Sequence, residues 1–178
     1  MTETLSHIAL RRLNGSERTD WYEPLAGVSV KVNAEGCLVI HAPQICPDAL
    51  TTNDLAELHP DGRRFRILGR RDNVICSGGL KIQIEEVEQL LRSHTDLPFF
   101  ITRQADERLG EAVVLLTETG WAKPLQALCE KVLPKYWQPR RYAETPHLPL
   151  TATGKPNRHG TETLVLDILQ AEPQNLGE

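Results

Sequence analysis

The hydrophobic period of this chain changes once, near Gly69, and this change limits the possible folds more than any other feature. Before it, apolar residues alternate with polar ones, so that every second residue of 27–32 is valine. After it, apolar residues recur at helical spacing, as in 84–91. A period of two predicts half-buried strands, and a period near 3.6 predicts amphipathic helices. The sequence therefore predicts an α+β protein with a boundary at 69–73.

The first region predicts an antiparallel β subdomain built from two hairpins. Segments 27–32 and 37–41 flank the turn sequence Asn-Ala-Glu-Gly, and segments 50–58 and 63–68 flank His-Pro-Asp-Gly. Asn, Asp, Pro and Gly are the residues that tight turns favour. We expect this subdomain to occupy residues 1–70.

The second region predicts helices packed on a small sheet within residues 71–171, followed by a loose tail at 172–178. The first helix carries Glu85, Glu86 and Glu88, which we expect on its solvent-exposed side. A second helix is predicted to have Pro124 in its first turn and to end before Pro134. The remaining expected elements are strands at 97–103, 111–117 and 140–145, a loop at 146–157 and a helix at 161–169.

Composition and charge exclude several classes of protein. The 178 residues include 20 Lys and Arg and 24 Asp and Glu, a net charge of −4 that offers no general attraction to nucleic acid or anionic membranes. The longest apolar runs, such as 112–116, are far shorter than the roughly 18 residues of a membrane span. Its first residues lack the apolar segment of a signal peptide. The four cysteines form no CxxC pair, so we expect free thiols in a cytoplasmic protein.

Four polar clusters could carry chemistry: Thr2-Glu3-Thr4, Asn53-Asp54, Ser77-Gly78-Gly79 with Lys81, and the loop that ends at Lys155. Taken singly, each is more typical of a solvated terminus, a turn or a wet loop. The loop at Lys155 is also no phosphate-binding P-loop, because that motif needs Gly where this chain has Pro149, and Ser or Thr where it has Pro156.

Taken in order, six segments resemble the C-terminal half of the AMP-forming acyl-CoA synthetase (adenylate-forming) superfamily: 2–4, 52–56, 68–75, 77–82, 85–88 and 148–155. That family uses ATP to convert a carboxylic acid to an acyl adenylate and then transfers the acyl group to coenzyme A. The resemblance implies ATP, Mg²⁺, coenzyme A and a small carboxylic acid as ligands. It also implies that 1–70 ends a large domain and that 71–171 is a mobile lid domain.

The resemblance also assigns roles to individual residues. Glu3 matches the magnesium ligand, and Thr2 matches a hydroxyl beside the adenylate phosphate. Asp54 matches the carboxylate that binds both ribose hydroxyls, although Asn53 replaces the glycine that usually precedes it. Arg70 matches an arginine that reaches the ribose region. Asp72 matches the hinge residue about which the family's small C-terminal domain rotates between the two half-reactions.

Two further matches concern the acyl group and its acceptor. Ser77, Gly78, Gly79 and Lys81 match a loop along the path of the pantetheine arm. Lys155 matches the lysine that contacts the substrate carboxylate and the α-phosphate during adenylation, where a cation stabilises the developing negative charge. Ser6 and His7 follow the magnesium motif and are expected in the wall of the acyl pocket.

The family's phosphate-binding loop and most of its acyl pocket lie upstream of the motif that begins at Thr2. We therefore expect a truncated chain or a misassigned start, weak ATP binding and little catalysis by the chain alone. An exposed apolar face on the severed β region could favour a homo-oligomer.

The strings around residues 1–7, 73–88 and 150–158 are most similar to o-succinylbenzoate–CoA ligases of menaquinone biosynthesis. A ligase for another aryl or fatty acid, or an adenylation domain that feeds a carrier protein, is the alternative. A different class is a non-catalytic phosphate-binding or RNA-binding module, based on a basic run that includes Phe65: Arg63, Arg64, Arg66, Arg70 and Arg71. The acidic net charge disfavours a nucleic-acid partner.

Overall fold

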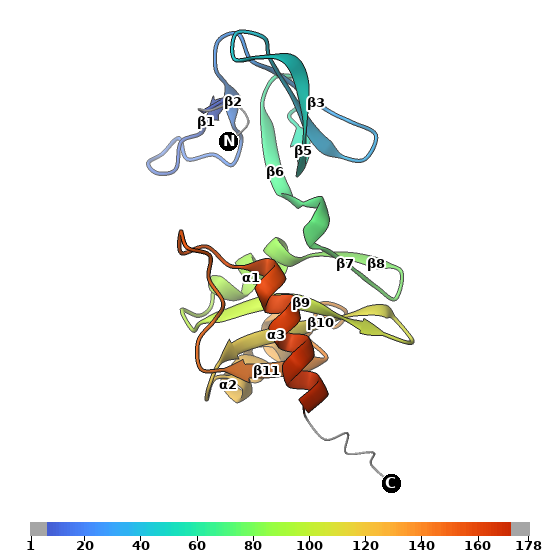
Figure 1. Cartoon of the computed structure of the whole chain (residues 1–178). Coiled ribbons are helices and arrows are strands. Elements are labelled where there is room, and N and C mark those ends of the chain that lie inside the picture. The colour runs from blue at the N-terminus through green and yellow to red at the C-terminus, as the bar shows by residue number, and fades with distance from the viewer. Residues whose placement is uncertain (1–6, 172–178) are drawn as a thin grey trace. The chain divides into compact units, whose positions relative to one another are not determined.

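The computed structural model describes residues 7–171 and divides into two compact units between Asn73 and Val74 (Figure 1). The sequence placed the boundary after residue 70. Each unit contains its own sheet and its own cluster of buried apolar side chains. Thr2, Glu3, Ser6 and the expected tail lie outside the described residues.

The first unit is built on a four-stranded antiparallel sheet in the order β3-β4-β5-β6. Its strands are β3 (Ser29–Val32), β4 (Cys37–Ala42), β5 (Cys46–Leu58) and β6 (Phe65–Arg70). Both hairpins expected from the sequence are confirmed. The short pair β1 (Ala9–Leu10) and β2 (Glu23–Pro24) was not predicted, and neither was the 3₁₀ turn η1 (Arg71–Asn73).

Local chemistry explains the first hairpin turn. The Asn33 side-chain oxygen accepts hydrogen bonds from the backbone N–H groups of Glu35 and Cys37, at 3.1 and 2.8 Å. Gly36 has a φ of 81°, a left-handed conformation that is easiest for glycine. The core of this unit comes from β4, β5, β6 and the residue before β1, and is made of Ile8, Leu38, Ile40, Ala42, Ala56 and Phe65.

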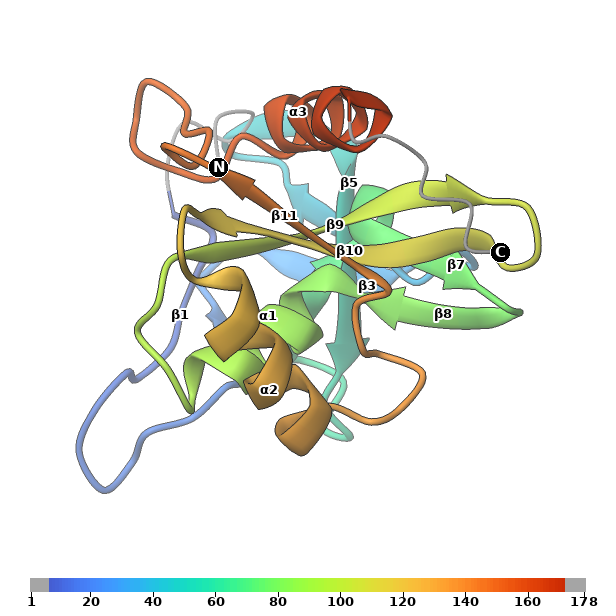
Figure 2. The ribbon, with the colours of Figure 1, turned by 90° about the horizontal axis from the view of Figure 1, so that it is seen from below.

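The second unit has a five-stranded sheet with helices on both faces. β10 (Gly110–Glu118) is central: β9 (Phe99–Asp106) is antiparallel to it and β11 (Arg141–Thr145) is parallel to it. The hairpin of β7 (Val74–Ser77) and β8 (Leu80–Gln83) joins β10 through Ser77 and Gly110. Figure 2 shows α1 (Ile84–Arg92) and α2 (Ala122–Val132) on one side of β9, β10 and β11, and α3 (Arg158–Ala171) on the other.

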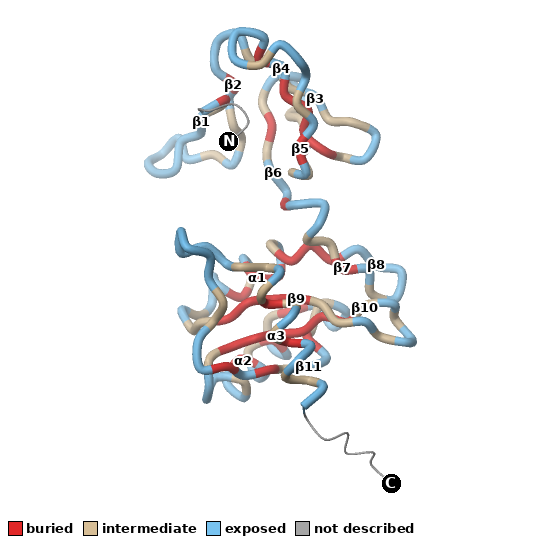
Figure 3. Tube along the Cα trace, viewed as in Figure 1, coloured by how far each residue is buried: buried red, intermediate tan, exposed pale blue. Residues whose placement is uncertain are grey.

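The alternation of side chains along β10 builds two separate cores, and both faces of this strand are buried (Figure 3). Val113 and Leu115 pack with α1 and α2, whereas Val114 and Leu116 pack with α3. Successive residues of a strand point to opposite faces, so one continuous apolar run supplies both layers.

Two expectations need correction. Glu88 is 6% exposed, and so is not on the solvent-exposed side of α1. Burial is tolerated because its carboxylate accepts a backbone N–H and two guanidinium bonds. The last helix begins at Arg158 and not near 161, because the Asn157 side chain accepts the N–H of Gly160 at 3.0 Å and caps the first turn. Among residues 7–171, no helix is long and apolar enough to cross a membrane.

Candidate functional site

Three of the predicted site residues form one chain of contacts at the end of the first unit. Strand pairing sets Asp54 of β5 opposite Arg70 of β6, with 3.8 Å between the Arg70 Nη1 and Asp54 Oδ1 atoms. Arg70 also binds Asp72 in a two-bond arrangement, through Nε and Nη2, at 2.9 Å each. The arginine therefore lies between the predicted ribose carboxylate and the predicted hinge carboxylate.

Buried groups beneath Asp54 fix the course of β5. Thr52 is buried, and its hydroxyl donates to the Leu38 carbonyl at 2.9 Å while it accepts the Asp54 N–H at 3.1 Å. Asn53 points the other way and accepts a 3.0 Å bond from Arg71. The residue that replaces the family's glycine thus contacts the 3₁₀ turn that contains Asp72.

The ion pair between Arg70 and Asp72 affects the pKa of the Asp72 carboxyl group. Hydrogen bonds from the Arg70 guanidinium hold the pKa of Asp72 below its usual range, although partial burial opposes this shift. Both side chains are about half exposed, so water screens much of the attraction. The pair can therefore form and separate at small cost, as a hinge contact would need.

The Ser77-Gly78-Gly79 segment is a tight turn between β7 and β8. Gly78 and Gly79 have φ values of 57° and 83°, and the Gly78 N–H donates to the Leu109 carbonyl at 2.9 Å. Lys81 follows on β8 and is exposed. Two left-handed glycines and a backbone hydrogen bond therefore define the shape of this segment.

A pocket of about 380 Å³ opens beside this turn, within the second unit. Its wall combines Ser77, Gly78 and the apolar Leu80 with the segment after α2, which contributes Lys135, Tyr136 and Arg140 among others. These three were missed in the sequence, since a Lys-Tyr pair after Pro134 gives no local signal that it faces a turn far away in the chain. Two cations and an exposed aromatic ring are thus gathered at one opening.

Lys155 is exposed on a compact loop. The Thr151 N–H donates to the Lys155 carbonyl at 2.7 Å, and the Lys155 N–H donates to the Thr151 hydroxyl at 3.1 Å. Gly154, with a φ of 76°, closes the turn by donating to the Thr151 carbonyl. The Asn157 N–H donates to the Pro149 carbonyl and closes the base of the loop. The lysine is therefore presented by an ordered backbone.

The structure places the predicted residues in two groups. Asp54, Arg70 and Asp72 belong to the first unit, whereas the β7–β8 turn and Lys155 belong to the second. His7, expected near the acyl pocket, is exposed. Within residues 7–171, no group of three or more acidic, His or Cys side chains is arranged to hold a metal ion. The expected magnesium ligand, Glu3, precedes this range.

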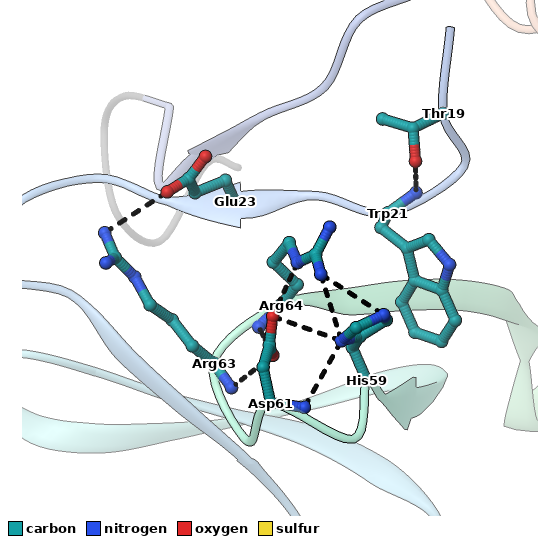
Figure 4. A network of polar contacts seen from close by, with 7 residues as sticks. All are labelled: Thr19, Trp21, Glu23, His59, Asp61, Arg63 and Arg64. Atoms are coloured by element: carbon teal, nitrogen blue, oxygen red, sulfur yellow. Dashed lines mark hydrogen bonds and ion pairs between the residues drawn. The ribbon is translucent and has the colours of Figure 1, made fainter. Parts of the chain in front are cut away.

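The basic run at 63–71 is paired with acids. Arg64 binds Asp61 at 2.6 Å, and Asp61 also accepts the backbone N–H groups of Arg63 and Arg64, as Figure 4 shows. Those hydrogen bonds keep the pKa of Asp61 well below its usual range. The other arginines of the run have acidic partners as well: Arg63 with Glu23, Arg66 with Glu57, Arg70 with Asp54 and Asp72, and Arg71 with Glu35. All five arginines of the run therefore lie in ion pairs, and Arg63 and Arg64 also contact the turn between β5 and β6 through Asp61.

No family model matches the chain. It is 30% identical over 160 residues to 2-methylpropanoate–CoA ligase of Humulus lupulus, a match that covers 85% of this chain and 26% of the relative. It is 27% identical over 185 residues to 2-succinylbenzoate–CoA ligase of Listeria monocytogenes, covering 89% of this chain and 38% of the relative.

The chain is also similar to a solved structure of such a ligase. The o-succinylbenzoate–CoA synthetase of Bacillus subtilis, in complex with its acyl-adenylate intermediate, matches with a TM-score of 0.70 and 25% identity. The match covers 89% of this chain and 39% of that one. The chain thus spans between about a quarter and two fifths of the length of these three relatives.

Proposed function

Because this chain belongs to the superfamily of AMP-forming acyl-CoA ligases, we propose that it supplies the C-terminal part of a ligase that forms an acyl adenylate and then a CoA thioester. The observation that carries the proposal is the contact of Arg70 with both Asp54 and Asp72. It joins a nucleotide-binding residue to the residue about which the second unit would rotate.

In this proposal Asp54 binds the ribose. A carboxylate has two acceptor oxygens, and these suit the two adjacent hydroxyls of the ribose. Arg70 places a positive charge 3.8 Å from the Asp54 carboxylate. A change in the backbone angles at Asp72 moves its carboxylate relative to Arg70, so the pair is one of the contacts that would change between the two half-reactions.

Lys155 serves the first half-reaction. An ammonium group placed beside the substrate carboxylate and the α-phosphate would stabilise the negative charge that develops as the carboxylate attacks the α-phosphorus of ATP and pyrophosphate leaves. The exposure of Lys155 and the hydrogen bonds within its loop support this role. A lysine that must contact a ligand bound elsewhere needs an exposed side chain on a backbone of fixed shape.

The second half-reaction would use the β7–β8 turn. Its glycines offer a path without side chains for the pantetheine arm, and Lys135 and Arg140 at the neighbouring pocket offer positive charge to the phosphates of coenzyme A.

The remaining ligands and the location complete the proposal. ATP would bring Mg²⁺ with it, and Glu3 is the proposed ligand of that ion. The similarity to two o-succinylbenzoate–CoA ligases supports o-succinylbenzoate as the acid. The four cysteines are free, which supports a cytoplasmic location.

A chimera tests the proposed function. Residues 1–178 replace the matching C-terminal part of the Bacillus subtilis synthetase, and pyrophosphate release and thioester formation are measured with o-succinylbenzoate. We expect both half-reactions, with pyrophosphate release lost in Lys155→Ala and retained in Lys123→Ala, which changes an exposed lysine of α2. A chimera whose activity survives both Lys155→Ala and Asp54→Ala would overturn the assignment.

The acid is tested separately, because the acyl pocket of the chimera comes from the other protein. The reading frame upstream of the codon for Met1 is sequenced and, where it continues, the longer protein is assayed with o-succinylbenzoate, benzoate and a fatty acid. Preference for either of the latter would contradict the proposed substrate.

A further inference from the structure

The carboxylate of Glu88 is the most enclosed acidic side chain among the ion pairs of the described residues, with 8% of the side chain exposed. It lies on α1, on the side turned toward the sheet. Its Oε1 atom accepts the backbone N–H of Ile101 at 2.9 Å. Burying a charge in this way is costly unless it is fully paired, so its partners indicate what it holds in place.

Its main partner is Arg158, 70 positions further along the chain. The Arg158 guanidinium donates to both Glu88 oxygens, at 2.6 and 2.8 Å, and a third bond of 3.2 Å goes to the Ile101 carbonyl. The pair thus satisfies both the N–H and the C=O of Ile101, as a neighbouring strand would, on the side of β9 that β10 does not cover. Two helices on opposite faces of the sheet are joined around this edge.

Arg158 is also the first residue of α3 and follows the Lys155 loop directly. Leu148 packs with the apolar cluster under α3 and fixes the start of the loop. The bond from the Asn157 N–H to the Pro149 carbonyl closes its base, next to Arg158. Between these points, hydrogen bonds within the loop order 151–155. The ion pair therefore holds the end of the loop that is nearest to Lys155.

We propose that Glu88 and Arg158 are positioning residues that hold the Lys155 loop in the arrangement needed for adenylation. This inference rests on the proposed function of Lys155. In this proposal neither side chain contacts substrate. Their effect acts through the backbone of 155–158, because a two-bond ion pair fixes the orientation of Arg158 as well as its distance from α1. A loop that is anchored at both ends loses less entropy when its lysine must reach one defined place.

Hydrogen exchange of the 178-residue chain, followed by NMR, tests the structural part without any need for activity. Glu88→Gln keeps an acceptor for the Ile101 N–H and removes the charge. We expect the loop amides of Thr151, Gly154 and Asn157 to exchange at least tenfold faster, with amides of α2 unchanged. Arg158→Lys keeps the charge without the two parallel bonds, and we expect a smaller increase. It also serves where Glu88→Gln does not fold.

Glu162→Gln is the matched control. It removes a different ion pair of α3, because Glu162 lies 3.2 Å from Arg103 of β9. Glu162 lies about one turn further along the helix than Arg158. We expect loop exchange within twofold of the parent. Unchanged loop exchange in both Glu88→Gln and Arg158→Lys would overturn the inference, and so would an equal increase in the control.

The chimera described above supplies the second readout. We expect Glu88→Gln to slow pyrophosphate release at least tenfold and to leave thioester formation from supplied acyl adenylate within twofold. An equal loss of both half-reactions would mean a general structural role and would overturn the inference. Failure of the proposed function is distinguishable, because Lys155→Ala would then leave pyrophosphate release intact whatever the loop exchange shows.

Discussion

Leu115→Ala is expected to destabilise the second unit and leave the first unit unchanged. Leu115 lies on β10, is fully buried and belongs to the cluster that packs against α1 and α2. Truncation of a buried leucine to alanine costs about 2–5 kcal/mol, the lost transfer free energy plus a cavity term. No part of the neighbouring sheet can close the cavity easily, because β10 is hydrogen-bonded to strands on both sides. We therefore expect about 3 kcal/mol.

This loss is a large share of the stability of such a unit. A domain on the order of 100 residues has a free energy of unfolding of about 5–15 kcal/mol. Each kcal/mol moves its melting temperature by about 4–8 °C, so Leu115→Ala should lower that of the second unit by about 10–25 °C.

Leu38→Ala is the matched change in the first unit, where Leu38 is almost completely buried in a separate cluster. Hydrogen exchange with mass spectrometry in increasing urea reports both units in one sample. We expect each variant to lower the urea midpoint of peptides from its own unit only. Equal shifts in peptides of both units, or a loss below about 1 kcal/mol in the mutated one, would refute the separate cores described above.

Three further outcomes follow from individual contacts. Asp72→Asn should lower the free energy of unfolding by at most about 1 kcal/mol at pH 7, because the Arg70–Asp72 pair is half exposed. The pKa of Asp72 is lowered on folding, so the stability difference between parent and variant in urea unfolding should disappear as the pH falls below 4. Thr52→Val should cost about 1–3 kcal/mol in the same assay, because the buried Leu38 carbonyl loses its hydroxyl partner. Burial raises the pKa of Cys129 to about 11, so a disulfide reagent at pH 8 should label the exposed Cys76 and reach Cys129 only after unfolding. Labelling of Cys129 in the folded chain would contradict its burial.

Local patterns determined most of the fold. Turn residues at 33–36 and 59–62, the alternation in 27–32 and the helical spacing in 84–91 each depend on neighbouring positions, and the structure has the expected elements there. The start of α3 was missed, although Asn157 is a good helix cap. The Pro-rich stretch before it favoured a loop, and a side-chain cap is visible only when its hydrogen bond is known.

Short sequence motifs were enough to name the candidate site residues, but not to predict which of them contact one another. Asp54, Arg70 and Asp72 could be named from the order of short segments, but their contact depends on the pairing of β5 with β6. The pocket beside Ser77 was invisible, because its cations come from a segment that the fold brings to the β7–β8 turn.

Glu88 shows most clearly what tertiary structure decided. Its charge favoured the solvent-exposed side with Glu85 and Glu86, although it lies four positions after Ile84 and three before Leu91, on the buried face of α1. The sequence gives no sign of the arginine, 70 positions away, that pairs with it there. The sequence alone determined the elements, the turns and the order of the motifs, because these depend on steric and hydrogen-bonding preferences of adjacent residues. Only the folded chain decided which charges are buried, since burial becomes favourable only when a distant partner and an open strand edge meet the same side chain.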